Sequence, residues 1–110
     1  MKRLILFLTL VGVCSAAVAD TDKVFEQCRA KLKKSQKLDV LYDLKWEGST
    51  LRVVVGPTFY KIPIDAKEGF IETVNCFVNV GKPNCLNFDV LDWQTGKKIG
   101  RFESCSFSMN

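Results

Sequence analysis

The sequence predicts a small α+β domain, built from an antiparallel sheet with two helices packed on one face. Two observations carry this prediction. Apolar residues recur at helical spacing in two segments, and they alternate with polar residues in others. These segments follow the order helix, two strands, a short extended piece, helix and two strands. At 110 residues the chain is long enough for one such domain.

The start of the chain has the organisation of an export signal. Two basic residues precede an apolar run over residues 4–13, and Ala19 ends a small-x-small pattern of the kind that signal peptidase cleaves. The apolar run is too short for a stable membrane anchor. We therefore expect a signal peptide at residues 1–19, a mature domain at residues 20–110, and a periplasmic or extracellular location.

Composition excludes several classes of function. The net charge of +4 falls to +2 when the signal is removed, which argues against a nucleic-acid partner. The chain has no histidine, so histidine-based catalysis and histidine metal sites are excluded. No Gly-rich phosphate loop or carboxylate-rich calcium loop is present. We expect neither a cofactor nor a metal.

Four cysteines remain after the signal is removed. An even number in a small exported domain predicts two disulfide bonds. The spacing includes no C-x-x-C pair, which a redox site or a zinc site would need. The cysteines are Cys28, Cys76, Cys85 and Cys105.

The pairing of these cysteines has two solutions. Cys28 lies on the apolar face of the first helix and needs a partner in the sheet, whereas Cys76 lies opposite the apolar stripe of the second helix. This favours Cys76–Cys85 with Cys28–Cys105, the pairing that we prefer. The register of the last hairpin places Cys85 opposite Cys105, which would instead leave Cys28 for Cys76.

The first half of the mature chain reads as a helix followed by a hairpin. Residues 20–37 carry acidic and N-capping side chains at their start and a single apolar face. Two strands, at residues 38–46 and 50–55, are joined by a turn around Gly48. A further short extended piece is expected at residues 59–62, before a proline.

A second helix is predicted from Asp65, with Glu68 completing a capping box. Its apolar residues recur at i, i+1, i+4, i+7 and i+8. Residues 74–80 are β-rich and also suit a strand, but the cap and the stripe agree on a helix that ends before Gly81.

The final element is a hairpin. Apolar and polar residues alternate over residues 86–90, a turn with glycine follows at residues 94–96, and the return strand spans residues 99–107. In this register Phe88 faces Phe102.

Catalysis is not expected. Asp89 and Asp92 lie near a hairpin end, and Asp65 and Glu68 lie at a helix start, so a small carboxylate-dependent hydrolase is one alternative. Capping and turn formation account for these residues without chemistry.

Binding is the remaining class of function. Trp46, Phe59, Tyr60 and Trp93 are our candidate binding residues, because aromatic side chains at hairpin ends and loops are frequent interface anchors. The opposing interpretation is that they close the ends of the core. Basic residues on the first helix suit either an anionic partner or a solvated face. We favour a non-enzymatic interaction module that binds another protein in the cell envelope or outside the cell.

Three segments give a resemblance to known proteins. Residues 53–60 (VVVGPTFY), residues 65–68 (DAKE) and residues 92–97 (DWQTGK) look like small exported bacterial proteins of unknown function. This resemblance covers most of the mature chain. It implies an exported α+β domain and supplies no activity.

A partial resemblance to cystatins suggests a second alternative. Residues 52–56 (RVVVG) are similar to the Q-x-V-x-G loop of these secreted protease inhibitors, and Trp93 in a late hairpin is similar to their Pro-Trp loop. The chain departs from the pattern at Arg52, where cystatins have glutamine, and at Asp92, where they have proline. We therefore rank a protease inhibitor below an interaction module.

Overall fold

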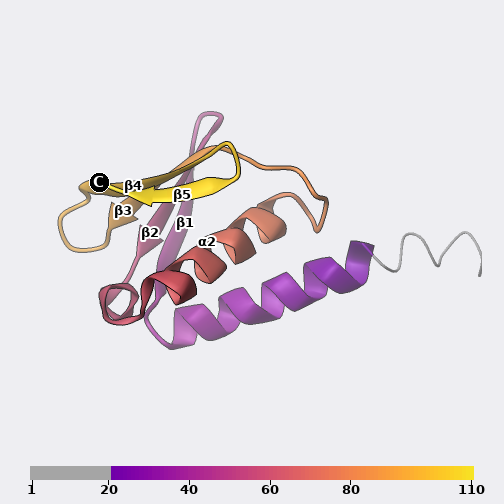
Figure 1. The fold of residues 1–110 in the computed structure, drawn as a ribbon, viewed down its shortest axis with the longest axis horizontal. Helices are drawn as coiled ribbons and strands as arrows, with labels where there is room; N and C mark the ends of the chain where they lie inside the picture. Colours follow the sequence, from indigo (N-terminus) through magenta and orange to yellow (C-terminus); the bar gives the residue numbers. More distant parts are fainter. Residues whose placement is uncertain (1–20) are drawn as a thin grey trace, which may run out of the picture.

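A computed structural model of the protein describes residues 21–110. The export signal expected at residues 1–19 lies outside the described residues. Two helices and a five-stranded sheet make up the described chain, which confirms the predicted α+β class (Figure 1). Both helices lie on the same side of the sheet, as expected.

The sheet keeps its strands in sequence order, β1-β2-β3-β4-β5. Three of its strand pairs are antiparallel, but β2 and β3 run parallel because helix α2 (Ile64–Val78) crosses over between them. The sheet is thus mixed rather than wholly antiparallel. Its strands are β1 (Leu41–Glu47), β2 (Thr50–Val55), β3 (Phe88–Asp92), β4 (Lys98–Glu103) and β5 (Ser106–Met109).

The alternation of apolar and polar residues did not predict the hairpin that β4 and β5 form at the C-terminus. Residues 99–107 were expected to form one strand, but the chain reverses at Ser104 and Cys105, whose φ values are 52° and 64°. Two successive positive φ values are typical of a type I′ turn, which usually carries Asn-Gly. Without that dipeptide the turn leaves no signal in the sequence.

The segment after β2 is helical rather than extended. Residues 59–62 were expected to be extended, whereas Pro57–Lys61 form a 3-10 helix that begins with proline. Gly56 precedes it and is buried, and a side chain there would collide with the backbone carbonyl of Asp39. This close approach requires glycine.

Helix α2 confirms the preference for a helix over a strand at its C-terminal half. Its N-cap is Pro63, two residues before the predicted Asp65, so Asp65 lies in the first turn and forms no cap. The predicted capping box is therefore wrong. Beyond the helix the chain turns at Gly81, whose φ is 78°.

The core lies between the sheet and α2. Strand β2 contributes three fully buried side chains, and the neighbouring strands and α2 complete the layer. Burial of each large aliphatic or aromatic side chain stabilises the fold by about 1.5–3 kcal/mol. The fully buried side chains are Leu51, Val53, Val55, Phe59, Ile71, Val74, Val90, Phe88 and Phe102.

The N-terminal helix, residues 21–37, packs along α2 rather than directly over the sheet centre. In Figure 1, α2 lies between this helix and strands β3 to β5. The rings of Phe25 and Phe77 stack at 5.4 Å, and Leu32 is the one buried side chain of the helix. The N-terminal helix therefore packs on α2 through Phe25, and its Leu32 faces a groove that β1 also lines.

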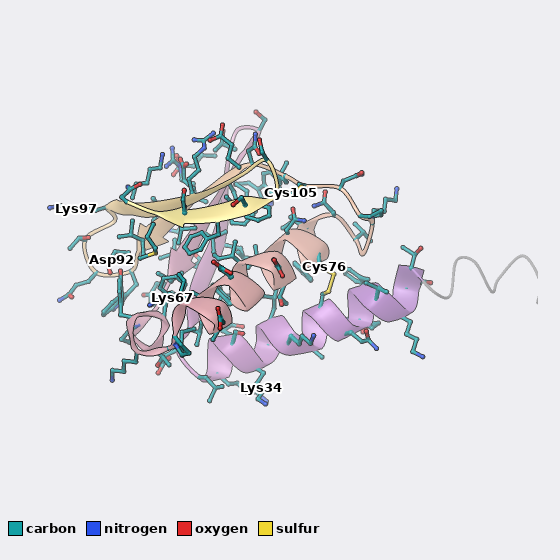
Figure 2. The ribbon with its side chains drawn as sticks, viewed as in Figure 1. Lys34, Lys67, Cys76, Asp92, Lys97 and Cys105 are labelled. Atoms are coloured by element: carbon teal, nitrogen blue, oxygen red, sulfur yellow. A yellow bond between two sulfur atoms is a disulfide. The ribbon has the colours of Figure 1, made fainter. Side chains whose placement is uncertain are left out.

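The disulfide bonds are Cys28–Cys76 and Cys85–Cys105. The preferred pairing, Cys76–Cys85 with Cys28–Cys105, is wrong, and the pairing indicated by the hairpin register is the one present. Figure 2 shows the bond that joins Cys76 to the N-terminal helix. Cys76 points away from the sheet, as expected, and the N-terminal helix occupies that side.

Asn75 explains why Cys85 does not reach Cys76. Its side chain donates to the carbonyl of Asn84 at 2.9 Å and accepts from the N–H of Leu86 at 2.9 Å. The backbone on both sides of Cys85 is thereby held against one face of α2, while Cys76 faces the N-terminal helix.

We expect both disulfide bonds to contribute strongly to stability. From the sequence separations of 48 and 20 residues, replacing Cys28 and Cys76 by serine should cost about 4 kcal/mol, and replacing Cys85 and Cys105 about 3 kcal/mol. Urea unfolding of the two double variants measures both values. A non-reducing peptide mass map that shows any other pairing would contradict the assignment.

Candidate functional site

Tyr60 and Trp93 come together at one end of the sheet. Tyr60 lies in the 3-10 helix and Trp93 in the turn after β3, and their ring centroids are 6.1 Å apart. The backbone N–H of Trp93 donates to the carbonyl of Val55 at 3.1 Å, and the Tyr60 hydroxyl donates to the carboxylate of Asp92. The pair is therefore held rigidly, with Tyr60 42% exposed.

Asp92 organises the turn that carries Trp93. Its second carboxylate oxygen accepts from the N–H groups of Gln94 and Thr95, at 3.0 and 2.8 Å, and from the Thr95 hydroxyl at 2.9 Å. The hydrogen bond from Tyr60, with those from Thr95 and Gln94, lowers the pKa of Asp92. Burial, and then the contact with Asp92, raises the pKa of Tyr60 well above 10. The carboxylate of Asp92 therefore stabilises the turn that follows β3.

The other two candidate aromatic residues lie elsewhere. Phe59 is fully buried, with its ring 6.0 Å from that of Phe70 and 6.3 Å from that of Phe107, so it belongs to the core. Trp46 is 58% exposed, near the tip of the β1–β2 hairpin. Because β2 and β3 are parallel, this tip lies at the opposite end of the sheet from Trp93.

Asp89 is surrounded by cations on the open face of the sheet. Its carboxylate lies 3.1 Å from Arg101, 3.4 Å from Lys98 and 3.7 Å from Arg52, and its side chain is only 15% exposed. The charge of Asp89 is therefore compensated by neighbouring strands. This arrangement stabilises the sheet face rather than leaving a free acid or base.

A groove between the N-terminal helix, β1 and α2 is a surface feature that the sequence did not predict. Its volume is about 170 Å³. Four apolar side chains line it, namely Leu32, Leu41, Leu44 and Phe77. Its remaining lining is polar and comes from the N-terminal helix, namely Arg29, Lys33 and Gln36. A bulge in β1 between Leu41 and Asp43 breaks strict alternation, so no periodic signal marked these leucines as one surface.

The N-terminal helix carries the excess positive charge of the described chain. Residues 21–37 contain six basic and two acidic residues, whereas residues 38–110 contain eight basic and nine acidic residues. Lys34 projects from the side of this helix that is remote from the sheet (Figure 2). Of the predicted basic face, Arg29 and Lys33 line the groove, whereas Lys34 points away from it.

Three further features of the described residues bear on the chemistry. The segment similar to the cystatin loop, residues 52–56, lies in strand β2 and the residue after it, with Val53 and Val55 fully buried. Within residues 21–110, no cluster of three or more metal-ligating residues is present. Over the same residues, no helix has the length and apolar character to cross a membrane.

Asp89→Asn should destabilise the fold. The change leaves three cations facing one another without the central negative charge, and we expect a loss of about 1–2 kcal/mol in the free energy of unfolding. Urea unfolding measures it. Glu103→Gln, at the exposed end of the same network, serves as the control and should cost less than about 0.5 kcal/mol. Equal effects of both substitutions would contradict this account.

Tyr60→Phe should flatten the dependence of stability on pH at both ends. The raised pKa of Tyr60 gives a contribution that is complete below pH 10.0 and lost as the pH rises further. The lowered pKa of Asp92 gives a contribution present above pH 3.8 and lost as the pH falls below it. Urea midpoints of the two proteins, compared across pH, test both. Parallel curves for the variant and the original protein would show that this hydrogen bond is not coupled to folding.

Comparison of the chain with protein-family profiles, with curated proteins and with solved structures finds no significant match. Function must therefore be inferred from the surfaces described above.

Proposed function

We propose that the protein is a non-enzymatic interaction module that binds another protein in the cell envelope or outside the cell. The observation that carries the proposal is the rigid, partly exposed pair of Tyr60 and Trp93. Tyrosine and tryptophan bury a large area with few rotatable bonds, so they lose little entropy on binding. The hydrogen bond from the Tyr60 hydroxyl to Asp92 and the contact between the two rings reduce that loss further.

Export is part of this proposal. Two disulfide bonds are typical of a small domain in an oxidising compartment. The organisation of residues 1–19 as an export signal supports the same location.

Binding is favoured over catalysis by the engagement of the carboxylates. Asp92 accepts hydrogen bonds that hold its turn, and Asp89 is compensated by three cations. Asp65 lies in the first turn of α2, where a negative charge favours the helix dipole. Three of the four acids that the sequence offered for chemistry thus have a structural role.

Photo-crosslinking in the expressing cell tests this proposal. A benzophenone amino acid in place of Gln94, an exposed residue beside Trp93, should give a discrete covalent adduct with one partner protein. The matched control places it at Lys82, an exposed residue four positions beyond the C-terminal end of α2, which is labelled in Figure 1. Trp93→Ala in the first chain should abolish the adduct, while the melting temperature changes by less than about 3 °C.

Two results would contradict the proposal. Equal adducts from both positions would show that the contact is nonspecific. Unfolding of the domain by both Trp93→Ala and Trp93→Phe would show that Trp93 closes the core instead of contacting a partner.

A further inference from the structure

The groove beside the N-terminal helix follows from the way in which this helix is attached. The Cys28–Cys76 disulfide bond fixes the helix to α2 near the helix middle. At its C-terminal end the chain leads directly into β1, and the N–H of Val40 donates to the carbonyl of Ser35 at 2.9 Å. Four residues between these attachments, within 29–36, line the groove together with residues of α2 and β1. The groove is therefore formed by the fold itself, before any ligand binds.

The floor and one side of the groove are apolar. Leu32 and Leu41 are 5% and 6% exposed, so they form the floor. Leu44 and Phe77 are partly exposed and rise beside it. None of the lining residues that come from β1 or α2 is polar. An occupant therefore has to present hydrocarbon to these two elements, because an unpaired polar group placed against them would lose its hydrogen bonds to water.

The polar side chains of the groove all lie on the N-terminal helix. Arg29, Lys33 and Gln36 follow one another at i, i+4 and i+7, which places them along one edge. Within residues 21–110, Lys33 has no carboxylate at ion-pair distance, and Arg29 meets only Glu26, across an exposed contact of 3.5 Å. No acidic residue lines the groove. These charges favour an occupant that carries an anionic group on the side of the helix.

The size of the groove limits the apolar part of the occupant. Its volume of about 170 Å³ is close to the roughly 150 Å³ of an apolar cavity that binds benzene, so it holds about six carbon atoms. Arg29 and Gln36 are seven residues apart, which is about 10 Å along the helix axis, so the space is elongated. A single alkyl chain suits this shape, whereas an α-helix, about 10 Å across, is too wide to enter.

We propose that this groove binds the anion of a medium-chain fatty acid. The alkyl chain lies on the three leucines and Phe77, and Arg29 and Lys33 bind the carboxylate. A guanidinium can bind a carboxylate through two parallel hydrogen bonds, and Lys33 adds a second positive charge one helical turn away. The site shares no residue with the Tyr60–Trp93 pair, so either proposal can fail alone.

Calorimetric titration with octanoate tests the inference. The protein is used oxidised, as purified from the cell that expresses it, and octanoate is kept below the concentration at which it forms micelles. We expect saturable binding of one octanoate per chain. From butanoate to octanoate, each added methylene should tighten binding about two- to fourfold. Decanoate should bring little further gain, because the groove is then full.

A second series separates the contribution of the carboxylate from that of the chain. Octan-1-ol, which has the same chain without the charge, should bind roughly tenfold more weakly, and octylammonium should not bind. Arg29→Gln combined with Lys33→Gln should weaken octanoate binding roughly tenfold and leave octan-1-ol binding unchanged. Lys31→Gln combined with Lys34→Gln changes the net charge equally and is the control, since neither residue lines the groove.

Methyl resonances of the original protein locate the alkyl chain without any substitution. Saturation with octanoate should shift the methyl signals of Leu32, Leu41 and Leu44, which line the groove. The methyl signals of Leu38 should not move, because this residue is 54% exposed and does not line the groove. Leu44→Ser should flatten the dependence of affinity on chain length, whereas Leu38→Ser, the matched control, should leave it unchanged.

Several outcomes would overturn the inference. The absence of saturable octanoate binding would exclude the site. Equal losses from the two double substitutions would show that octanoate responds to net charge and not to this groove. An affinity that keeps rising beyond decanoate, or several molecules bound per chain, would indicate adsorption to the surface. Dimerisation that shifts the same methyl signals without octanoate would assign the groove to a second copy of the chain.

Discussion

The covalent bond between Cys28 and Cys76 is the constraint on which the arrangement of this domain depends. The N-terminal helix has one buried side chain, Leu32, and one stacked ring, Phe25 on Phe77. These contacts bury little apolar surface for a helix of this length, and the disulfide bond adds the stability that they lack. With the helix held on α2, the domain gains one wall of its groove and the segment that carries its excess positive charge.

The acidic residues have structural roles, and the aromatic residues Tyr60 and Trp93 have the proposed binding role. Asp89 balances three cations across the open face of the sheet, and Asp92 holds the turn that presents Trp93. Carboxylates that support the scaffold in this way keep the exposed surfaces rigid. Rigid surfaces lose less entropy when a partner binds. The structural role of the acids and the proposed binding role of Tyr60 and Trp93 are therefore parts of one arrangement.

The residues of the candidate site could be predicted from the sequence, but the contact between them could not, because they lie far apart along the chain. Tyr60 and Trp93 were both candidates because of their residue types and their places in loops. Their contact across 33 positions depends on the parallel pairing of β2 with β3, which brings the ends of both strands to the same edge. Phe59 has the same residue class and the same loop, yet it is buried, because a 3-10 helix replaces the expected extended piece and turns its ring inwards.

The sequence by itself determined the α+β class, both helices, the first hairpin and the presence of two disulfide bonds, because local periodicity and turn chemistry carry those features. Only the tertiary structure decided the cysteine pairing, since Asn75 holds the chain around Cys85 against one face of α2 while the N-terminal helix covers another. The hairpin between β4 and β5 was also decided by the tertiary structure, because positive φ values at Ser104 and Cys105 have no local signature in these residue types. The groove depends on three elements that meet only after folding, and no single segment of the sequence encodes it.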